Sequence, residues 1–334
     1  MVAPGVVALT VELETWPLIE PFRITGHTTL ELRVIVVTLR RDGYVGRGEA
    51  AGVFYRGEDV TAITRQVESV RAAVEAGIGR EALRRLLPNG GARNAVDCAL
   101  WDLEAKASNR PAWQVAGLEK PRALLTTFTC GADHPDRMAA AARRYTGARA
   151  LKLKLTGESL DAERVQAVRE ARPEVWLAVD ANQGFDRASL ERLMPVLVAA
   201  RVALIEQPFP IGREMPLDEL QAPIPIAADE SVQGMADLSR LIGRFNVINI
   251  KLDKCGGLTE ALEMARTARR LGFDVMIGNM LGTSLAMAPA FLVGQLCSVV
   301  DLDGPVFLRT DRDVGVVYAD GFISCPDALW GSPP

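Results

Sequence analysis

Histidine and lysine are the scarce ionisable residues of this 334-residue chain. It has two histidines, His27 and His134, and only six of its 38 basic residues are lysines, the other 32 being arginines. With so little histidine, sites in which imidazoles bind a metal or form a catalytic dyad are scarcely available. A proton carrier near neutral pH must therefore be a carboxylate or one of the few lysines, because arginine keeps its proton in proteins.

Paired cysteines, long apolar segments and an excess of one charge are also missing. The five cysteines form no CxxC pair, and their odd number without regular spacing indicates free thiols in a reducing compartment. The first residues, MVAPGVVALTVELETW, lack the features of a signal peptide, and no run of 18 apolar residues occurs. A net charge of −4 gives no electrostatic reason to bind nucleic acid or an anionic membrane. We therefore expect a soluble, cytoplasmic protein.

Residues 1–115 have the pattern of an α+β domain. Alternation with a period of two predicts a strand over 5–14, and β-rich runs predict two more over 29–40 and 44–49, the last two joined by a hairpin turn. Helical periodicity follows over about 59–77, 80–87 and 92–107.

From residue 116 onward, short β-rich runs alternate with helical runs. Eight strands are expected, over 124–128, 150–155, 175–180, 202–206, 224–229, 246–251, 273–277 and 298–302. Such alternation is typical of parallel βαβ units, and eight units predict a (β/α)8 barrel over 116–304. A doubly wound open sheet is the alternative, although it gives no reason for eight nearly equal units. The tail, 305–334, is turn-rich and β-like, and we expect it to pack against the N-terminal domain.

Ionisable residues recur along the second to sixth of these strands, near their carboxyl ends. In chain order they are Lys152, Lys154, Asp180, Glu206, Asp229 and Lys251. From Lys154 onward the spacings are 26, 26, 23 and 22 residues, which is about one βα unit each. Because the carboxyl ends of barrel strands meet at one mouth, where active sites form, we expect these side chains to make a ring.

The three carboxylates of this ring indicate a magnesium site. Asp180, Glu206 and Asp229 offer oxygen ligands without histidine or cysteine, a donor set that suits Mg²⁺. Any one of them alone could equally be a helix cap or an ion-pair partner. Three in register with three lysines favour a functional site.

The lysines indicate proton transfer. Lys152 and Lys154 are two positions apart on one strand and so point to the same face, into the barrel, while Lys251 lies across the mouth. A divalent cation between opposed lysines lowers the affinity of each for a proton. Lys254, in the segment KLDKCGG, either competes with Lys251 for this role or is an ordinary loop residue.

Five motifs in order carry a resemblance to a known family. They are LKLKL (151–155), VDANQG (179–184), IEQP (205–208), ADES (228–231) and IKLDKCGG (250–257). Together they resemble the muconate-lactonizing subgroup of the enolase superfamily, whose α+β capping domain corresponds to residues 1–115. The resemblance implies Mg²⁺ on Asp180, Glu206 and Asp229, and a lysine pair opposed by a lysine on the sixth strand. Enolase-superfamily sites of this kind stabilise an enediolate.

Within the subgroup, the chain resembles the dipeptide epimerases. Asp301 and Asp303 look like their DxD motif, which holds the α-ammonium of the first residue of a dipeptide, although Asp301 could instead be a helix cap or one of a solvated pair in a turn. Arg23, in PFRIT (21–25), matches an arginine that meets the acidic side chain of the second residue, or is an ordinary surface arginine. Tyr55, in the loop 52–58, is a further candidate for contact with the substrate.

Two hydroxyl residues complete the candidates for substrate binding. Thr283 and Ser284 follow the seventh strand, where they could contact the substrate or cap the next helix.

The predicted reaction is Mg²⁺-dependent epimerisation of a dipeptide at its C-terminal residue, L-Ala-L-Glu to L-Ala-D-Glu or a close relative. Lys154 and Lys251 would exchange the α-proton on opposite faces, and Lys152 would stabilise the enolate oxygen. The alternatives are o-succinylbenzoate synthase, N-acylamino acid racemase or muconate cycloisomerase chemistry, or a barrel that binds without catalysis. The expected partners are a dipeptide and further copies of the chain, without nucleic acid or membrane.

Overall fold

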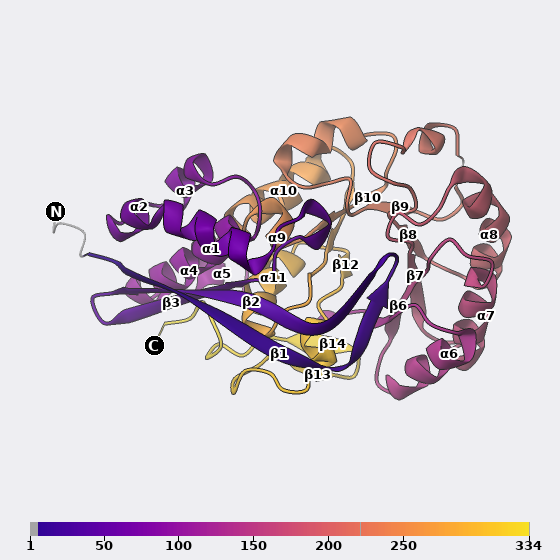
Figure 1. Cartoon of the computed structure of the whole chain (residues 1–334), viewed down its shortest axis with the longest axis horizontal. Coiled ribbons are helices and arrows are strands. Elements are labelled where there is room, and N and C mark those ends of the chain that lie inside the picture. Colours follow the sequence, from indigo (N-terminus) through magenta and orange to yellow (C-terminus); the bar gives the residue numbers. More distant parts are fainter. Residues whose placement is uncertain (1–5, 221, 334) are drawn as a thin grey trace.

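The computed structural model describes residues 6–220 and 222–333, so residue 5 of the first expected strand lies outside the described part. Two main bodies adjoin each other (Figure 1). One is an antiparallel three-stranded sheet with helices, and the other is a parallel eight-stranded sheet covered by helices. Within the described residues, every helix is too short or too polar to cross a lipid bilayer.

The N-terminal sheet is built around one long hairpin. Its strands are β1 (Ala8–Ile24), β2 (His27–Arg41) and β3 (Tyr44–Ala50). The hairpin extends beyond the expected strands, because residues 15–24 continue β1 past a register irregularity between Pro17 and Phe22. In Figure 1 this indigo hairpin runs from the N-terminal sheet across to the parallel strands.

Helices cover this sheet as the periodicity predicts, with one difference. They are α1 (Val60–Ser69), α2 (Arg71–Glu75), α3 (Arg80–Leu86) and α4 (Gly91–Ala107), so the helix expected over 59–77 is divided at Val70. Helix α4 packs against β3 at Gly46 and Gly48. A Cβ atom on Gly46 would lie 2.2 Å from the carbonyl oxygen of Ala99, so a side chain there would force the helix away from the sheet.

The parallel sheet has its strands in sequence order, which is the order of a barrel and excludes the doubly wound alternative. The strands are β5 (Phe128–Cys130), β6 (Ala150–Lys154), β7 (Trp176–Asp180), β8 (Leu204–Glu206), β9 (Ile226–Ala228), β10 (Val247–Ile250), β11 (Asp274–Ile277) and β12 (Val299–Val300). The first and last strands meet through a backbone hydrogen bond of 3.0 Å from Thr127 to Val300. The fold is therefore the predicted barrel of eight parallel strands, preceded by an antiparallel N-terminal domain.

The first barrel strand differs from the prediction. Residues 124–128 were expected to form it, but Leu124–Leu125 is a separate strand, β4, that pairs with β14 (Phe322–Ser324). Strand β14 also pairs with β13 (Val317–Ala319). Residues 124–125 therefore pair with the C-terminal tail, where Leu124 is buried and Leu125 is exposed, and the barrel strand starts at Phe128.

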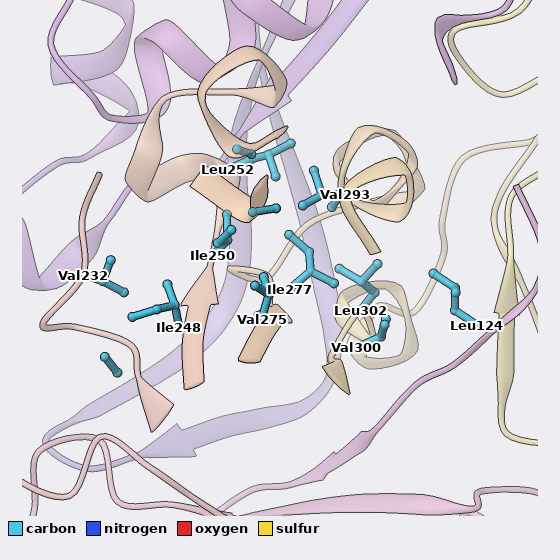
Figure 2. Packing of buried hydrophobic residues seen from close by; sticks show 14 of the residues in the cluster. Leu124, Val232, Ile248, Ile250, Leu252, Val275, Ile277, Val293, Val300 and Leu302 are labelled. Atoms are coloured by element: carbon cyan, nitrogen blue, oxygen red, sulfur yellow. The ribbon is translucent and has the colours of Figure 1, made fainter. Parts of the chain in front are cut away.

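Side chains alternate between the two faces of the barrel strands. On β10, Ile248 and Ile250 point outward into the main apolar core, and Figure 2 shows them beside Val275 and Ile277 of β11. The positions between them point inward. Apolar inward residues form a small layer in the interior, namely Ala178, Leu204, Ala227, Val247 and Met276. Two positions further along β7, β8, β9 and β10, the inward residues are polar, and this change of layer positions the candidate site.

Of the remaining helical segments, η1 lies in the N-terminal domain between β3 and α1, and the others follow α4 and accompany the barrel and its connections. The segments are η1 (Phe54–Arg56), α5 (Ala112–Val115), α6 (Pro135–Arg144), α7 (Asp161–Ala171), α8 (Arg187–Ala199), η2 (Met215–Asp218), η3 (Met235–Leu241), α9 (Leu252–Cys255), α10 (Leu258–Arg270), α11 (Ser284–Gly294) and η4 (Gly304–Phe307). After β8 and β9 the connections are 3₁₀ segments, so the units there are shorter than the alternation predicts.

The tail contacts the N-terminal domain at several points. Leu308 bridges to Leu18 of β1, and the indole nitrogen of Trp330 donates a 2.8 Å hydrogen bond to the carbonyl of Arg47. The amide of Gly331 donates to the buried carboxylate of Asp102 on α4, at 2.7 Å.

Candidate active site

Five neighbouring strands each contribute one ionisable side chain at the barrel mouth. In spatial order they are Lys154 (β6), Asp180 (β7), Glu206 (β8), Asp229 (after β9) and Lys251 (after β10), and we refer to them as the mouth row. The pairing register places Lys154 opposite Asp180, and Asp180 opposite Glu206. The predicted ring is therefore an arc of three carboxylates with a lysine at each end.

The three carboxylates fit a divalent cation. Asp180, Glu206 and Asp229 each offer an oxygen, and these oxygens lie within 4.8 Å of one another. Glu206 is fully buried, and its Oε2 atom has no hydrogen-bond partner among the described residues. A buried carboxylate oxygen without a partner is costly unless a cation or water satisfies it. Oxygen-only donors of this kind are what Mg²⁺ prefers.

One oxygen of each carboxylate is held by a donor of the scaffold. Asp180 Oδ1 accepts from the backbone amide of Asn182 at 2.8 Å, and Glu206 Oε1 accepts from the side chain of Asn249 at 2.7 Å. Asp229 Oδ1 accepts from Lys254 at 2.5 Å.

The second oxygen of each carboxylate faces one of the three predicted lysines. Lys154 donates to Asp180 Oδ2 at 2.5 Å, and Lys251 donates to Asp229 Oδ2 at 2.7 Å. Lys152 Nζ lies 3.5 Å from Glu206 Oε2. Each carboxylate thus has one oxygen that a scaffold donor holds and one oxygen that lies next to a lysine ammonium group.

The electrostatics of the row follow from burial and crowding. Burial, with the like charges of Asp180 and Asp229, raises the pKa of Glu206 to about 7. Burial acts in the same direction on Asp229, but the adjacent ammonium groups of Lys251 and Lys254 outweigh it and lower its pKa. Burial would lower the pKa of Lys251, yet the carboxylates of Asp229 and Glu206 raise it. The row therefore concentrates negative charge that a bound divalent cation would offset.

A second acidic pair lies beside the row, after β12. Asp301 accepts hydrogen bonds from the ammonium of Lys152 and the hydroxyl of Thr127. Asp303 accepts a 2.7 Å bond from the backbone amide of Thr129, and burial together with Asp301 raises its pKa to about 6. Both carboxylates are buried, so the solvated-turn alternative for Asp301 does not hold.

A cavity of about 370 Å³ lies between the barrel mouth and the N-terminal domain. Lys154, Asp229 and Lys251 line it on the barrel side. Side chains of the long hairpin and of the loop around η1 line the opposite side, among them Phe22, Ile24, His27, Phe54 and Tyr55. The cavity thus joins the two ends of the mouth row to a wall supplied by the other domain.

Comparison with known proteins agrees with this geometry. The N-terminal domain of the mandelate racemase/muconate lactonizing enzyme family matches residues 6–117, and the enolase C-terminal domain-like family matches residues 136–329. The chain belongs to the enolase superfamily.

Two named relatives and one solved structure are similar to this chain over most of its length. An L-Ala-D/L-Glu epimerase of Escherichia coli K12 is 40% identical over 92% of this chain and 96% of its own length. An N-acetyl-D-glutamate racemase of a Pseudoalteromonas species is 38% identical over 89% of this chain and 95% of its own. A solved enolase family member of Agrobacterium tumefaciens, described as homologous to dipeptide epimerases and containing sodium and L-Ala-L-Glu, superposes with a TM-score of 0.95, 41% identity and coverage of 97% and 100%.

The two candidates on the capping domain of this enolase-superfamily chain lie differently. Tyr55 lines the cavity, and its hydroxyl accepts a 3.1 Å hydrogen bond from Gln233. Arg23 pairs with Thr28 across the hairpin, whereas the cavity-lining pairs are Phe22 with Thr29 and Ile24 with His27. Paired positions alternate between faces, so Arg23 lies on the opposite face of the hairpin. There its guanidinium is half-exposed and lies 3.7 Å from Asp133.

Thr283 and Ser284 are not brought to the cavity. Thr283 caps α11, where its hydroxyl accepts from the amide of Leu285 and donates to Glu49. The Ser284 hydroxyl donates to Asp311. Both side chains are fully buried in these contacts between the barrel, the capping sheet and the tail. The expectation that they contact substrate is therefore corrected, because their hydroxyls already have partners: Thr283 is the cap of α11, and Ser284, the first residue of that helix, holds Asp311 instead.

Three residues of the site were missed by the sequence reasoning. Asn249 lies two positions before Lys251, so the alternation of β10 could have placed it inward beside the row. Asn182 stands in VDANQG and donates a 3.3 Å bond to Glu230. Glu230 follows Asp229 and is buried, burial raises its pKa to about 8, and its Oε2 atom has no partner among the described residues. Its position next to a predicted ligand was the available signal.

Proposed function

We propose that this superfamily member is an isomerase, a Mg²⁺-dependent epimerase that inverts the C-terminal residue of a dipeptide, with L-Ala-L-Glu and L-Ala-D-Glu as its substrate pair. The observation that carries the proposal is the mouth row, in which Lys154 and Lys251 stand at the two ends of the carboxylates and both line the cavity. The names of the Escherichia coli and Agrobacterium relatives support the dipeptide and its glutamate residue.

Each residue of the row has a role in this proposal. Asp180, Glu206 and Asp229 would hold Mg²⁺. When bound, the cation would supply positive charge next to the substrate carboxylate, and this charge favours removal of the α-proton. Lys154 removes or returns the α-proton on one face of the substrate, and Lys251 does so on the other. Two bases on opposite faces give inversion, whereas elimination chemistry on one face needs only one.

Lys152 and the acidic pair bind the charged ends of the reacting dipeptide. Lys152 contributes a fixed positive charge next to Glu206 and is suited to stabilise the enolate oxygen. Asp303 and Asp301 accept the α-ammonium of the first residue. Asp303 is the freer of the two, because Asp301 already neutralises Lys152. Tyr55, which lines the cavity, is a proposed contact of the second side chain. Arg23 is proposed as a second contact, for which its half-exposed side chain would have to leave Asp133 and turn round the tip of the hairpin.

Solvent isotope exchange tests the proposal. The protein is incubated with L-Ala-L-Glu and Mg²⁺ in D₂O, and products are analysed by chiral chromatography and mass spectrometry. We expect L-Ala-D-Glu to appear with one deuterium at the α-carbon of glutamate. Exchange without inversion would contradict the two-base assignment, and no exchange with any dipeptide would contradict the function.

Racemisation of N-acetylglutamate is a second candidate. The Pseudoalteromonas relative supports it, and so does Asp301, whose carboxylate is engaged by Lys152 and Thr127 before any ammonium arrives. The same D₂O assay with N-acetyl-L-glutamate distinguishes the two. Asp303→Asn should abolish dipeptide turnover only, because an N-acyl group carries no ammonium for Asp303 to hold.

Further proposals concern the chain as a whole. We propose that residues 1–115 form the capping domain and 116–304 the catalytic barrel. The five free thiols support a cytoplasmic location. We also propose a homo-oligomer, because apolar side chains such as Val198 and Met215 are exposed. Light scattering of the purified protein would test this.

A further inference from the structure

Lys254 is the most deeply buried lysine near the mouth row. Its exposed fraction is 1%, and it is absent from the lining of the cavity, where Lys154 and Lys251 are found. Its ammonium lies 2.5 Å from Asp229 Oδ1, 2.6 Å from the carbonyl oxygen of Asp229 and 3.0 Å from that of Asn249. These three acceptors use all three protons of the ammonium. Lys254 therefore has neither the access nor a free proton to act on a substrate.

The same contacts connect two of the three carboxylates. Lys254 holds Asp229 by both its side chain and its backbone, which fixes the end of β9. It also holds the backbone of Asn249, whose side chain donates to Glu206 at 2.7 Å. A single ammonium thus fixes Asp229 directly and Glu206 through Asn249.

Each side-chain oxygen of Asp229 accepts a hydrogen bond from a different lysine, and the two lysines differ in their surroundings. Lys251 donates to Oδ2 from a side chain that lines the cavity and has no second hydrogen bond among the described contacts. Lys254 donates to Oδ1 from within the scaffold. A cation that shares the carboxylates can replace the ammonium of Lys251 at Oδ2, but it cannot replace Lys254 without breaking three hydrogen bonds.

We propose that Lys254 is a positioning residue of the metal site: it keeps Asp229 Oδ1 occupied, so that Oδ2 stays directed toward Asp180 and Glu206. This inference rests on the proposed function only in its assignment of Mg²⁺ to the three carboxylates. Partners that orient metal ligands typically change metal affinity about 10- to 100-fold when they are removed. Lysine suits the position because its ammonium is a compact charge with three rotatable donors, whereas the planar guanidinium of arginine is larger and differently shaped.

Lys251 offers a matched control for the experiment. It is on the same turn and donates to the same carboxylate, but to the opposite oxygen. Mg²⁺ binding is measured by calorimetry on metal-free Lys254→Met and Lys251→Met, without any substrate, and the melting temperature is measured in EDTA. We expect the Kd for Mg²⁺ to rise roughly 10- to 100-fold in Lys254→Met. In Lys251→Met we expect it to stay equal or fall, because a competing ammonium is removed.

Turnover at saturating Mg²⁺ is a second measurement, with a result that a purely structural role of Lys254 would not predict. At saturating Mg²⁺, Lys254→Met should recover most of the wild-type rate, while Lys251→Met should remain inactive. Wild-type Mg²⁺ affinity in Lys254→Met, or equal weakening in both variants, would overturn the inference. If Lys254→Met does not fold, Lys254→Arg keeps the charge and tests the same point: weaker Mg²⁺ binding at an unchanged melting temperature supports the inference, and unchanged binding refutes it.

The design separates this inference from the proposed function. Calorimetry needs only Mg²⁺ as its probe. If wild-type protein exchanges no dipeptide proton in D₂O but Lys254→Met still binds Mg²⁺ more weakly, the dipeptide assignment fails and the role of Lys254 stands.

Discussion

The barrel side and the capping side of the cavity are built in different ways. On the barrel side, the side chains of the mouth row are at most 8% exposed, and each is tied to a neighbour by a hydrogen bond. On the capping side, Phe54 is 40% exposed, and its main ring contact is a stack with His27 at 4.3 Å. The difference separates two tasks. Strand ends hold the groups that need fixed distances, and a hairpin and a loop supply the wall that meets the variable part of a substrate.

The largest expected effect comes from substitutions on the barrel side of the cavity. Lys154→Ala and Lys251→Ala should each lower the rate of epimerisation by about 10²- to 10⁴-fold, the usual contribution of a general acid or base. The measurement is the initial rate of L-Ala-D-Glu formation. Lys120→Ala, at an exposed position, is the control and should behave as wild type. Normal epimerisation by either active-site variant would remove that lysine from the mechanism.

A second change at the barrel side concerns the cation. Glu206→Gln should weaken Mg²⁺ binding by roughly 10- to 100-fold, because one of three charged ligands becomes neutral. Without Mg²⁺ the variant should melt at the same temperature or higher, since a buried charge beside Asp180 and Asp229 is gone. Thermal shift with and without Mg²⁺ measures both. A large loss of stability in EDTA with unchanged Mg²⁺ response would contradict the assignment.

A change on the capping side should affect recognition and leave the chemistry intact. Arg23→Met is expected to raise KM for L-Ala-L-Glu by roughly tenfold with little change in kcat, the usual size for a lost charged hydrogen bond. Arg137→Met is the matched control, because Arg137 contacts the same carboxylate, Asp133, at 3.6 Å. Equal effects of the two variants would show that Asp133, and not a substrate carboxylate, is the relevant partner of Arg23.

The smallest expected effect on catalysis comes from a change where the two sides meet, and there the effect is on stability. Asp253 accepts hydrogen bonds from the amides of Ala51 and Gly52 in the capping loop, and burial together with Glu58 raises its pKa to about 7. An unfolded aspartate titrates near pH 3.9, so the folded state binds more protons between about pH 4 and 7, and stability falls as pH rises through that window. Asp253→Asn keeps an acceptor but removes this dependence.

Urea unfolding at several pH values checks this. The stability of Asp253→Asn relative to wild type should increase from pH 4 to pH 7 and then level off. A constant difference between the two proteins over this range would mean that Asp253 does not titrate with the raised pKa.

The two sides also differed in how well the sequence predicted them. The barrel side depends on two simple rules, alternation along a strand and the meeting of strand ends at one mouth, and these brought Lys154, Asp180, Glu206, Asp229 and Lys251 together. The capping side depends on tertiary pairing. Nothing local shows that residues 15–24 continue β1, and that extra length decides which face of the hairpin carries Arg23.

Partners that lie far apart in the chain explain the remaining differences. Leu124 and Leu125 have the composition of a barrel strand, but they pair with β14, about 200 residues later. Thr283 contacts Glu49 through the packing of the N-terminal domain on the barrel, and Lys152 contacts Asp301 because the barrel brings its second and eighth strands together. The local sequence carries no information about partners that lie so far away in the chain.

The mouth row is a palindrome: lysine, aspartate, glutamate, aspartate, lysine, read from either end. In the proposed reaction, a dipeptide that enters with an L residue and one that enters with a D residue would meet the same sequence of groups, with the roles of proton donor and proton acceptor exchanged. Lys152 and the acidic pair lie outside this sequence and are proposed to bind parts of the dipeptide that inversion leaves in place. Lys254, on only one aspartate, is absent from the lining of the cavity. A site of this form treats the two hands of its substrate nearly alike, and therefore runs in either direction according to supply.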